Sequence, residues 1–424
     1  MRVLVISRSA WRNDNSTGNT LTDFFTDFED AEFYSLCMRE QPPQNEIAKR
    51  HFYISEKQLI QHLLNRHSKV GAENFAEAIV DNSEKKLYDF AKKHPSTLMM
   101  MAREMLWNVG GWKNNNLKEY IKEVNPDVVF FPVFGCYYPH KVLKYIHSLT
   151  NAKIVLFHAD DNYTLKQFSL SPLYWIYRFG LRKWVRRSVR IADVQYCISV
   201  VQKADYDKMF GCECKLLTKF SDFSVDPNLK TDFGTPLQLV FTGNINTNRW
   251  KSLALLVETL KRINNDAIKA QLRIYTATPL TKAMTKALSV ENTSFLMGTV
   301  PASKISQIQR EADMLVHTEG LDLKSRLVVR QSFSTKIVDY LKAARPIVAI
   351  GPKNVASIKH LIDNDCAIVA NNKEELYEKL SLIIDSTQQL HMYAMRAYLC
   401  GRSNHDKTKQ KEMLQKDFYQ LSNN

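Results

Sequence analysis

Ser334, Thr335 and Lys336 form a polar group at the point where an apolar helical pattern begins. The group follows the predicted strand Met314–His317, so it is placed near the carboxyl end of a parallel sheet, where α/β proteins bind ligands. Backbone N–H groups at a helix start, two hydroxyls and an ammonium could together hold phosphate oxygens. Asp339, one turn later, could accept both hydroxyls of a ribose. An ordinary helix cap followed by a solvated lysine and aspartate fits the same pattern.

The composition limits the class of protein. The chain has 424 residues, 45% of them apolar, which is enough for two domains with large cores. The formal net charge of +14 favours anionic partners such as nucleotides, phosphates or an acidic membrane surface. Seven cysteines without a C-x-x-C pair are typical of reduced thiols. The apolar run at the N-terminus is too short for a signal peptide, and no run approaches ~20 apolar residues, so we expect a cytoplasmic protein.

Short apolar runs alternate with longer amphipathic segments along most of the chain, and this alternation predicts parallel sheets with crossover helices. Residues 40–125 break the rhythm and are interpreted as a helical elaboration of the first domain. The helices expected there include Glu56–His67, Glu84–Lys93 and Leu117–Val124. The strands expected in the first domain are Arg2–Ser7, Val128–Phe134, Lys153–Ala159, Val194–Ser199 and Lys215–Phe220.

Turn residues over Ser221–Pro236 predict a linker, after which the alternation restarts. We therefore predict one α/β domain over residues 1–230 and a second one over residues 236–400. A helical tail over 401–424 could pack back on the first domain. Two sheets of this kind in tandem imply a cleft between them.

Three segments, in the correct order, resemble family 4 glycosyltransferases with the two-Rossmann-domain B fold. "SFSTKIVDYLKAARPIVAIGP" (332–352) is similar to the donor-site segment P-S-K-x-x-E-Y-L-A-x-G-x-P-V of that family. "ADVQYCISVVQKADYDKMFG" (192–211) resembles a segment near the end of the first domain, and "LVFTGNINTNRWKSLALLVETL" (239–260) resembles the start of the second. The resemblance implies an α/β protein with two Rossmann-like parallel-sheet domains facing a cleft and a helical insertion in the first domain.

The resemblance also implies a donor site. Asp339 occupies the place of the second acid in the family's E-x7-E pair and would bind the ribose, while Gln331 stands where the first acid is usual. Glu319, before the long segment "GLDLKSRLVVRQ", is the candidate for a contact with the donor sugar. The family's G-R-x4-K loop reads Gly243-Asn244 and then Arg249 here. Arg249 and Lys336 would therefore grip the diphosphate, together with Ser334 and Thr335, although Arg249 could also belong to a solvated helix start.

In the first domain, Gly18 and Asn19 follow the first strand, where the resemblance implies contact with acceptor and phosphate; a plain strand-to-helix turn is the alternative. No G-x-G-x-x-G fingerprint is present, so we expect no dinucleotide redox cofactor. His158 ends a predicted strand at a position where the family has a histidine beside the reacting sugar. Asp160 or Asp161 could orient an acceptor hydroxyl or act as a base, or both could be turn formers. Adjacent carboxylates point apart, so we expect no metal.

The segment "LYWIYRFGLRKWVRRSVRIAD" (173–193) predicts a basic, aromatic-rich helix. It could adhere to an anionic membrane where a lipid-linked acceptor waits, or it could be a crossover helix with a wide core face. Nucleic-acid binding fits the charge but no recognisable module is present.

The leading hypothesis is a hexosyltransferase-like enzyme of surface polysaccharide synthesis. It would move a sugar from a nucleotide-diphosphate sugar to a glycan or lipid-linked acceptor, with retention implied by the resemblance and without a cofactor. It would be cytoplasmic and could be peripheral on the inner membrane face. Two alternatives stay open: a nucleotide-sugar epimerase of the same fold, and a non-catalytic protein that binds polyanions or nucleotides.

Overall fold

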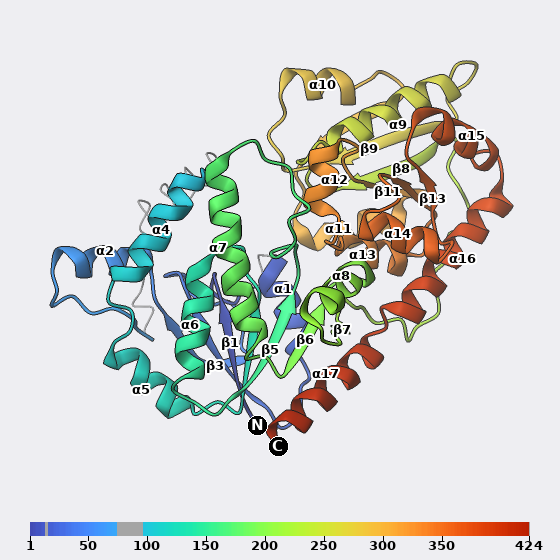
Figure 1. Ribbon diagram of the computed structural model, residues 1–424. Helices are drawn as coiled ribbons and strands as arrows, with labels where there is room; N and C mark the ends of the chain where they lie inside the picture. The colour runs from blue at the N-terminus through green and yellow to red at the C-terminus, as the bar shows by residue number, and fades with distance from the viewer. Residues whose placement is uncertain (13–15, 74–95, 424) are drawn as a thin grey trace. The chain divides into compact units, whose positions relative to one another are not determined.

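A computed structural model describes residues 1–12, 16–73 and 96–423 (Figure 1). The helix expected over Glu84–Lys93 lies outside these residues. Contacts divide the chain into two compact units. Unit 1 comprises Met1–Ile198, Lys203–Leu217 and Lys411–Asn424, and unit 2 comprises Ser199–Gln202 and Thr218–Gln410.

Unit 1 contains a parallel sheet with the strand order β3-β2-β1-β4-β5-β6-β7. Val5 of β1, for example, aligns with Ser35 of β2 on one side and with Phe130 of β4 on the other. Successive strands extend outward in both directions from β1, so the winding reverses between β1 and β4. The strands are β1 (Arg2–Ser7), β2 (Glu32–Cys37), β3 (Ala48–Tyr53), β4 (Val128–Pro132), β5 (Lys153–His158), β6 (Val194–Cys197) and β7 (Lys215–Leu216).

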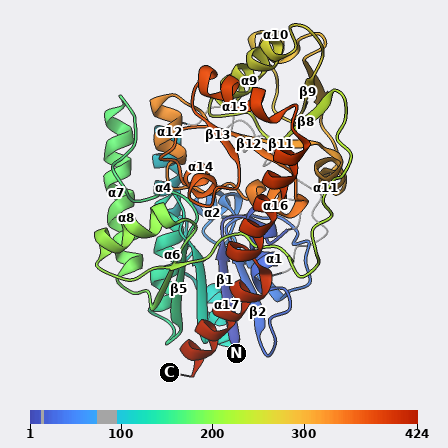
Figure 2. The same cartoon turned by 90° about the vertical axis from the view of Figure 1, so that its right-hand side faces the viewer.

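Helices cover both faces of the unit 1 sheet, because alternate side chains of each strand point to opposite faces. On one face Leu4 and Phe131 pack with α4 (Thr97–Val109), α5 (Asn115–Val124), α6 (Tyr137–His147) and α7 (Pro172–Val189). On the other face Phe130 contacts α1 (Ser16–Phe25) and α17 (Lys407–Ser422). Figure 2 shows α6 and α7 on one side of these strands and α17 on the other. Unit 1 therefore has three layers.

The prediction of helices alone for residues 40–125 is wrong at β3, an edge strand of the unit 1 sheet. Lys49 and Arg50 project from β3 and pair with carboxylates, Lys49 with Glu32 at 2.6 Å and Arg50 with Glu73 at 2.7 Å. Such charges are common on edge strands, and they break the apolar alternation by which a strand is recognised. Helices α2 (Glu56–Leu64), α4 and α5 do lie in this region.

Unit 2 contains a second parallel sheet, with the strand order β10-β9-β8-β11-β12-β13. Its winding reverses between β8 and β11, as it does between β1 and β4 in unit 1. The strands are β8 (Leu237–Thr242), β9 (Ala270–Tyr275), β10 (Ser294–Gly298), β11 (Met314–Thr318), β12 (Ile347–Ile350) and β13 (Ile368–Ala370). The prediction of two parallel-sheet α/β domains is confirmed.

The unit 2 sheet also lies between helices (Figure 1). One face packs against α9 (Arg249–Ile263), α10 (Lys282–Leu288) and α15 (Lys373–Ile383). On the other side α11 (Ala302–Glu311), α13 (Lys336–Ala343) and α16 (Thr387–Asn404) contact one another in sequence, α13 lying between the other two. The other helices among the described residues are α12 (Leu323–Val329) and α14 (Ala356–Asp363) of unit 2, and α8 (Val200–Phe210), most of which belongs to unit 1. The segment between Glu319 and Ser332, interpreted from the sequence as a long loop, therefore contains α12.

Replacing Phe418 by alanine should destabilise unit 1 by about 3 kcal/mol, because it leaves a cavity in an aromatic cluster. The Phe418 ring is fully buried, and its centroid lies 5.9 Å from that of Phe25, 5.6 Å from that of Phe28 and 6.2 Å from that of Phe130. Urea unfolding followed by tryptophan fluorescence measures the effect. Lys416→Ala, on the exposed side of the same helix, is the matched control. Equal unfolding midpoints for the two variants would contradict this packing role.

Candidate functional site

The polar residues predicted for the donor domain gather at the reversal point of the unit 2 sheet. Gly243 and Asn244 directly follow β8, and Glu319 directly follows β11, the strand beside it. Arg249 begins α9 and Lys336 begins α13. In open α/β sheets, ligands bind where the winding reverses, at the carboxyl ends of the strands. The topology of unit 2 therefore places these side chains at its expected ligand site.

Gly243 allows the Lys336 side chain to reach the end of β8. The backbone of Gly243 has φ of +138°, a conformation that other residues rarely adopt. A Cβ atom at this position would lie 1.6 Å from Lys336 Nζ. Only glycine leaves room for the ammonium here, which also lies 5.4 Å from the centre of the Phe241 ring.

Arg249 is held in place by a buried carboxylate. Its Nε and Nη2 atoms lie 3.0 and 2.9 Å from Glu319 Oε2, and its Nη1 donates to Asn244 Oδ1 at 3.0 Å. The other oxygen of Glu319 is 3.5 Å from His317 Nε2. Burial raises the pKa of Glu319, but His317 and Arg249 outweigh it and bring that pKa below its usual value. Glu319 is therefore an ionised anchor for the guanidinium.

Lys336 has no such anchor. No hydrogen bond or ion pair to its ammonium is found among the described residues. Burial lowers its pKa to about 8, and the positive charge of Arg249 contributes in the same direction. An anion bound between Lys336 and Arg249 would attract both cations and would therefore stabilise the charged form of Lys336 against burial and against the charge of Arg249. The site is thus electrostatically suited to a phosphate or diphosphate.

The first turn of α13 is fixed to the sheet by a buried tyrosine. The Tyr340 hydroxyl lies 3.3 Å from Thr242 Oγ1, and that same oxygen accepts a hydrogen bond from Gln309 at 3.0 Å. All three residues are buried. Because Tyr340 lies one turn after Lys336, this network fixes the position of the lysine relative to Gly243. The preceding Ser334 donates its backbone N–H to Ser357 Oγ at 2.9 Å, and Thr335 makes no side-chain cap.

Asp339, the predicted ribose ligand, pairs with a lysine. Lys219 Nζ donates to Asp339 Oδ1 at 2.7 Å, and both side chains are partly exposed. The pair leaves Oδ2 of the carboxylate for another donor. Lys219 was not recognised from the sequence because 120 residues separate it from Asp339. His317 was missed as well, since a histidine at a strand end gives no local pattern.

His158, the predicted catalytic histidine of unit 1, is buried in the core. Its Nε2 lies 3.2 Å from Gln195 Oε1, and its ring packs edge-on against Tyr206 at 4.9 Å. Burial lowers its pKa to about 4, so the ring is neutral near pH 7. A direct contact with a substrate would require the ring to leave this packing, and its catalytic role stays a prediction that this geometry does not favour.

The other predicted residues of unit 1 have differing surroundings. Asp160 is exposed just after β5, whereas Asp161 is buried and binds Arg178 at 3.0 Å. Gly18 lies inside α1 rather than in the loop before it, and a Cβ there would come within 1.8 Å of the Arg12 carbonyl oxygen. Close backbone packing accounts for this glycine. Asn19 is exposed on α1. The acceptor roles of Asp160, Gly18 and Asn19 stay predictions.

Potential metal ligands do not gather at the candidate site. Within the described part of the chain, one group of three lies close together: Asp207, Cys212 and Cys214 of unit 1, whose ligand atoms are within 4.8 Å of one another. Asp207 is already engaged, because it accepts the Cys214 N–H at 2.7 Å and pairs with Lys203 at 2.6 Å. These bonds give the group a structural role, because they close the loop after α8.

Glu319→Gln should destabilise unit 2 by about 3 kcal/mol near pH 7, because it removes the charge that compensates the partly buried Arg249. Since the pKa of Glu319 is lowered in the folded protein, its contribution is complete above the unfolded value of about 4.3 and is lost as pH falls through the folded pKa. Urea unfolding of both proteins between pH 3 and 7 measures this. A difference that does not shrink toward pH 3 would contradict the assigned charge.

Comparison with known proteins finds one family that matches the part of the chain containing this site. Residues 236–386 match the family described as glycosyl transferases group 1. This range covers β8 to α15 and includes Gly243, Arg249, Glu319 and Lys336. No curated protein sequence matches the chain significantly. Among the described residues no helix is long and apolar enough to cross a bilayer.

Two of the solved structures similar to this chain share its fold over nearly the whole length, and a third shares it over part of the length. The complex of Anabaena HepE with UDP has 11% sequence identity and a TM-score of 0.64, covering 99% of this chain and 100% of that one. Sucrose-phosphate synthase from Thermosynechococcus elongatus has 10% identity and a TM-score of 0.63, covering 99% and 98%. TarM has 13% identity and a TM-score of 0.51, covering 72% and 57%. Residues 236–386 thus resemble glycosyl transferases group 1, and the two α/β domains of the chain have the glycosyltransferase B-type fold.

Proposed function

We propose that the protein is a glycosyltransferase that uses a nucleotide-diphosphate sugar as donor. The observation that carries this proposal is the convergence of the Lys336 ammonium and the Arg249 guanidinium at Gly243, inside the domain that matches glycosyl transferases group 1. Lys336 compensates for Asn244, which replaces the arginine that is usual in this loop. The diphosphate would lie between the two cations.

These cations would act mainly on the leaving group. When the bond between the sugar and the diphosphate breaks, negative charge accumulates on the diphosphate. Donors that are already in position then stabilise the transition state more than the ground state, which accelerates the reaction. Ser334 and Thr335 would add hydroxyl donors, and Glu319 would act through Arg249 by fixing its guanidinium. The step needs no metal ion.

The nucleoside would be held by Asp339. Lys219 occupies one carboxylate oxygen, so the other would accept a ribose hydroxyl. Uridine is the first base to test, because HepE, which has the same fold, was crystallised with UDP and with UDP-glucose. The acceptor would be a glycan or a lipid-linked sugar of surface polysaccharide synthesis, bound by unit 1 through Asp160, Gly18 and Asn19. Retention of configuration and a role for His158 belong to the same proposal.

Lys336→Ala and Arg249→Ala should each lower kcat by roughly 100-fold or more, the usual cost of removing one donor to a developing negative charge. Sugar transfer from a panel of radiolabelled nucleotide sugars measures turnover. Near-normal turnover in both variants would refute the proposed diphosphate grip. A nucleotide sugar that binds and is isomerised, or is left unchanged with every acceptor, would refute the transferase itself.

Lys336→Arg is the matched control, because it keeps the charge at this position. Since the pKa of Lys336 is about 8, affinity of the original protein for a nucleoside diphosphate should weaken as pH rises past 8, whereas that of the arginine variant should not. Parallel pH profiles for the two proteins would contradict an ammonium–phosphate contact.

We further propose that unit 1 adheres to an anionic membrane surface through residues 173–190. Three large apolar side chains of this helix and of the segment just before it are strongly exposed: Leu170 at 89%, Ile176 at 59% and Phe179 at 56%. Lys183 and Arg186 are exposed further along α7. Arg178, another basic residue of this helix, is buried against Asp161 and would not take part. The combination of apolar and basic groups is typical of interfacial helices.

The double variant Ile176→Ser/Phe179→Ser should bind anionic vesicles at least about 10-fold more weakly, because each side chain would contribute more than 1 kcal/mol on insertion. Co-sedimentation with vesicles of phosphatidylglycerol at low salt measures this. Leu382→Ser, which changes an even more exposed apolar residue on α15 of unit 2, should have no effect. If the unaltered protein does not sediment with the vesicles, the membrane proposal is wrong.

A further inference from the structure

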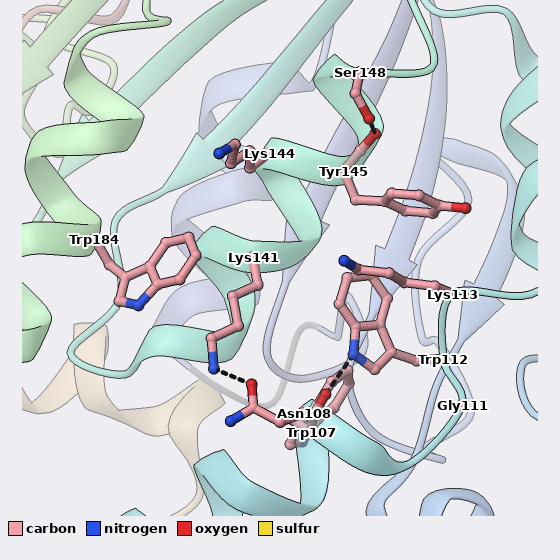
Figure 3. Close-up of a pocket in the computed structure, with 10 residues that line it drawn as sticks. All are labelled: Trp107, Asn108, Gly111, Trp112, Lys113, Lys141, Lys144, Tyr145, Ser148 and Trp184. Atoms are coloured by element: carbon pink, nitrogen blue, oxygen red, sulfur yellow. Dashed lines mark hydrogen bonds between the residues drawn. The ribbon is translucent and has the colours of Figure 1, made fainter.

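A pocket of about 440 Å³ opens among the helices of unit 1 and shares no residue with the charged cluster of unit 2 (Figure 3). Its walls come from the end of α4, the loop from α4 to α5, the outer side of α6, and α7. The volume lies in the range of small-molecule sites, about 300–1,000 Å³. The pocket could not be identified from the sequence, because its residues are spread from Trp107 to Trp184.

Aromatic side chains build the frame of the pocket. Trp112 is buried, donates its indole N–H to the Trp107 carbonyl at 2.5 Å and packs edge-on against Tyr145 at 5.5 Å. Trp184 of α7 forms the opposite side, and Figure 3 shows its ring and that of Tyr145 on either side of the lysines of α6. Tyr145 and Trp184 are only partly buried, so their rings can contact a ligand.

Two lysines of this pocket lie against aromatic rings. Lys113 Nζ lies 5.3 Å from the Trp112 ring centre and 5.4 Å from that of Tyr145. Lys141 Nζ lies 5.6 Å from the Trp184 ring centre and donates to Asn108 Oδ1 at 2.6 Å. Cation–π contacts position an ammonium without cancelling its charge.

Nearby acids leave most of this charge uncompensated. Glu104 lies 3.6 Å from Lys141, but it is buried behind the pocket and accepts the Tyr137 N–H at 2.6 Å. Lys113 and Lys144 have no carboxylate partner among the described residues. Burial lowers the pKa of Lys141, as expected for a cation whose charge is not fully balanced. The pocket is therefore a positively charged site with aromatic walls.

We propose that this pocket binds an anionic sugar, a pyranose ring that carries a carboxylate or a phosphate. The C–H faces of the ring would pack on Trp184 and Tyr145, and Lys113, Lys141 and Lys144 would bind the anion. The amide N–H groups of Asn108 would donate to ring hydroxyls, since its oxygen already accepts from Lys141. A neutral sugar would leave the lysines without a counter-charge, and a free inorganic anion would leave the rings uncovered.

The inference goes beyond the proposed function, because the pocket shares no residue with the diphosphate site and binding there requires no turnover. It is tested by calorimetric titration of the full chain with four probes: a glucuronate-containing disaccharide, glucose 6-phosphate, cellobiose and inorganic phosphate. We expect saturable binding of at least one of the two charged sugars, with affinity at least 10-fold greater than that for cellobiose and for inorganic phosphate.

Variants of the chain connect this binding to the pocket. Lys113→Ala/Lys144→Ala should weaken binding of the charged sugar at least 10-fold, and so should Trp184→Ala. The matched control is Lys118→Ala/Lys122→Ala, which removes the same charge from exposed positions of α5 in the same unit.

Several outcomes would overturn the proposal. They are the absence of binding at millimolar concentration, equal affinity for cellobiose, equal affinity for inorganic phosphate, and equal loss in the α5 control. Anionic vesicles are a fifth probe: loss of vesicle binding in the pocket variants without binding of either charged sugar would assign these lysines to the membrane surface instead. Because no donor is present in the titrations, failure of the sugar transferase assay does not affect their result.

Discussion

The Lys336 ammonium reaches the end of β8 because residue 243 has no side chain, and the proposed diphosphate site of unit 2 depends on this close approach. Without a nearby anion, the positive charges of Lys336 and Arg249 would repel each other at the reversal point of the sheet. Glu319 reduces this repulsion, because its buried carboxylate pairs with Arg249 and leaves Lys336 as the unbalanced charge. The tyrosine network around Tyr340 then keeps the lysine in place. A fixed, partly desolvated cation is what a transferring enzyme needs at a leaving phosphate.

The two units have the same sheet architecture, but their charged and aromatic residues lie at different places on it. Both have a parallel sheet whose winding reverses beside its first strand, so both have a natural ligand edge. In unit 2 that edge carries the charged cluster. In unit 1 the basic and aromatic residues lie instead on the outer helices α6 and α7, where they form a pocket and an exposed apolar surface. The net charge of +14 is thus divided among surfaces with different physical character.

Much of the fold could be predicted from the sequence because buried parallel strands are continuous apolar runs; β1, for example, begins and ends where the pattern places it. β3 could not, because its edge position permits lysine and arginine. The residues of the unit 2 cluster could be named from local motifs. Their partners could not: Lys219 is far from Asp339 in the chain, and the burial of His158 depends on which way its side chain points from the strand end.

The division of the chain into units has a consequence for biosynthesis. Unit 2 is almost contiguous in the sequence, because residues 218–410 make up nearly all of it. Unit 1, in contrast, needs residues 411–424 to complete its aromatic core around Phe418. During translation, which proceeds from the N-terminus, residues 218–410 are synthesised before residues 411–424. The aromatic core of unit 1 around Phe418 can therefore be completed only after the residues of unit 2 have been made.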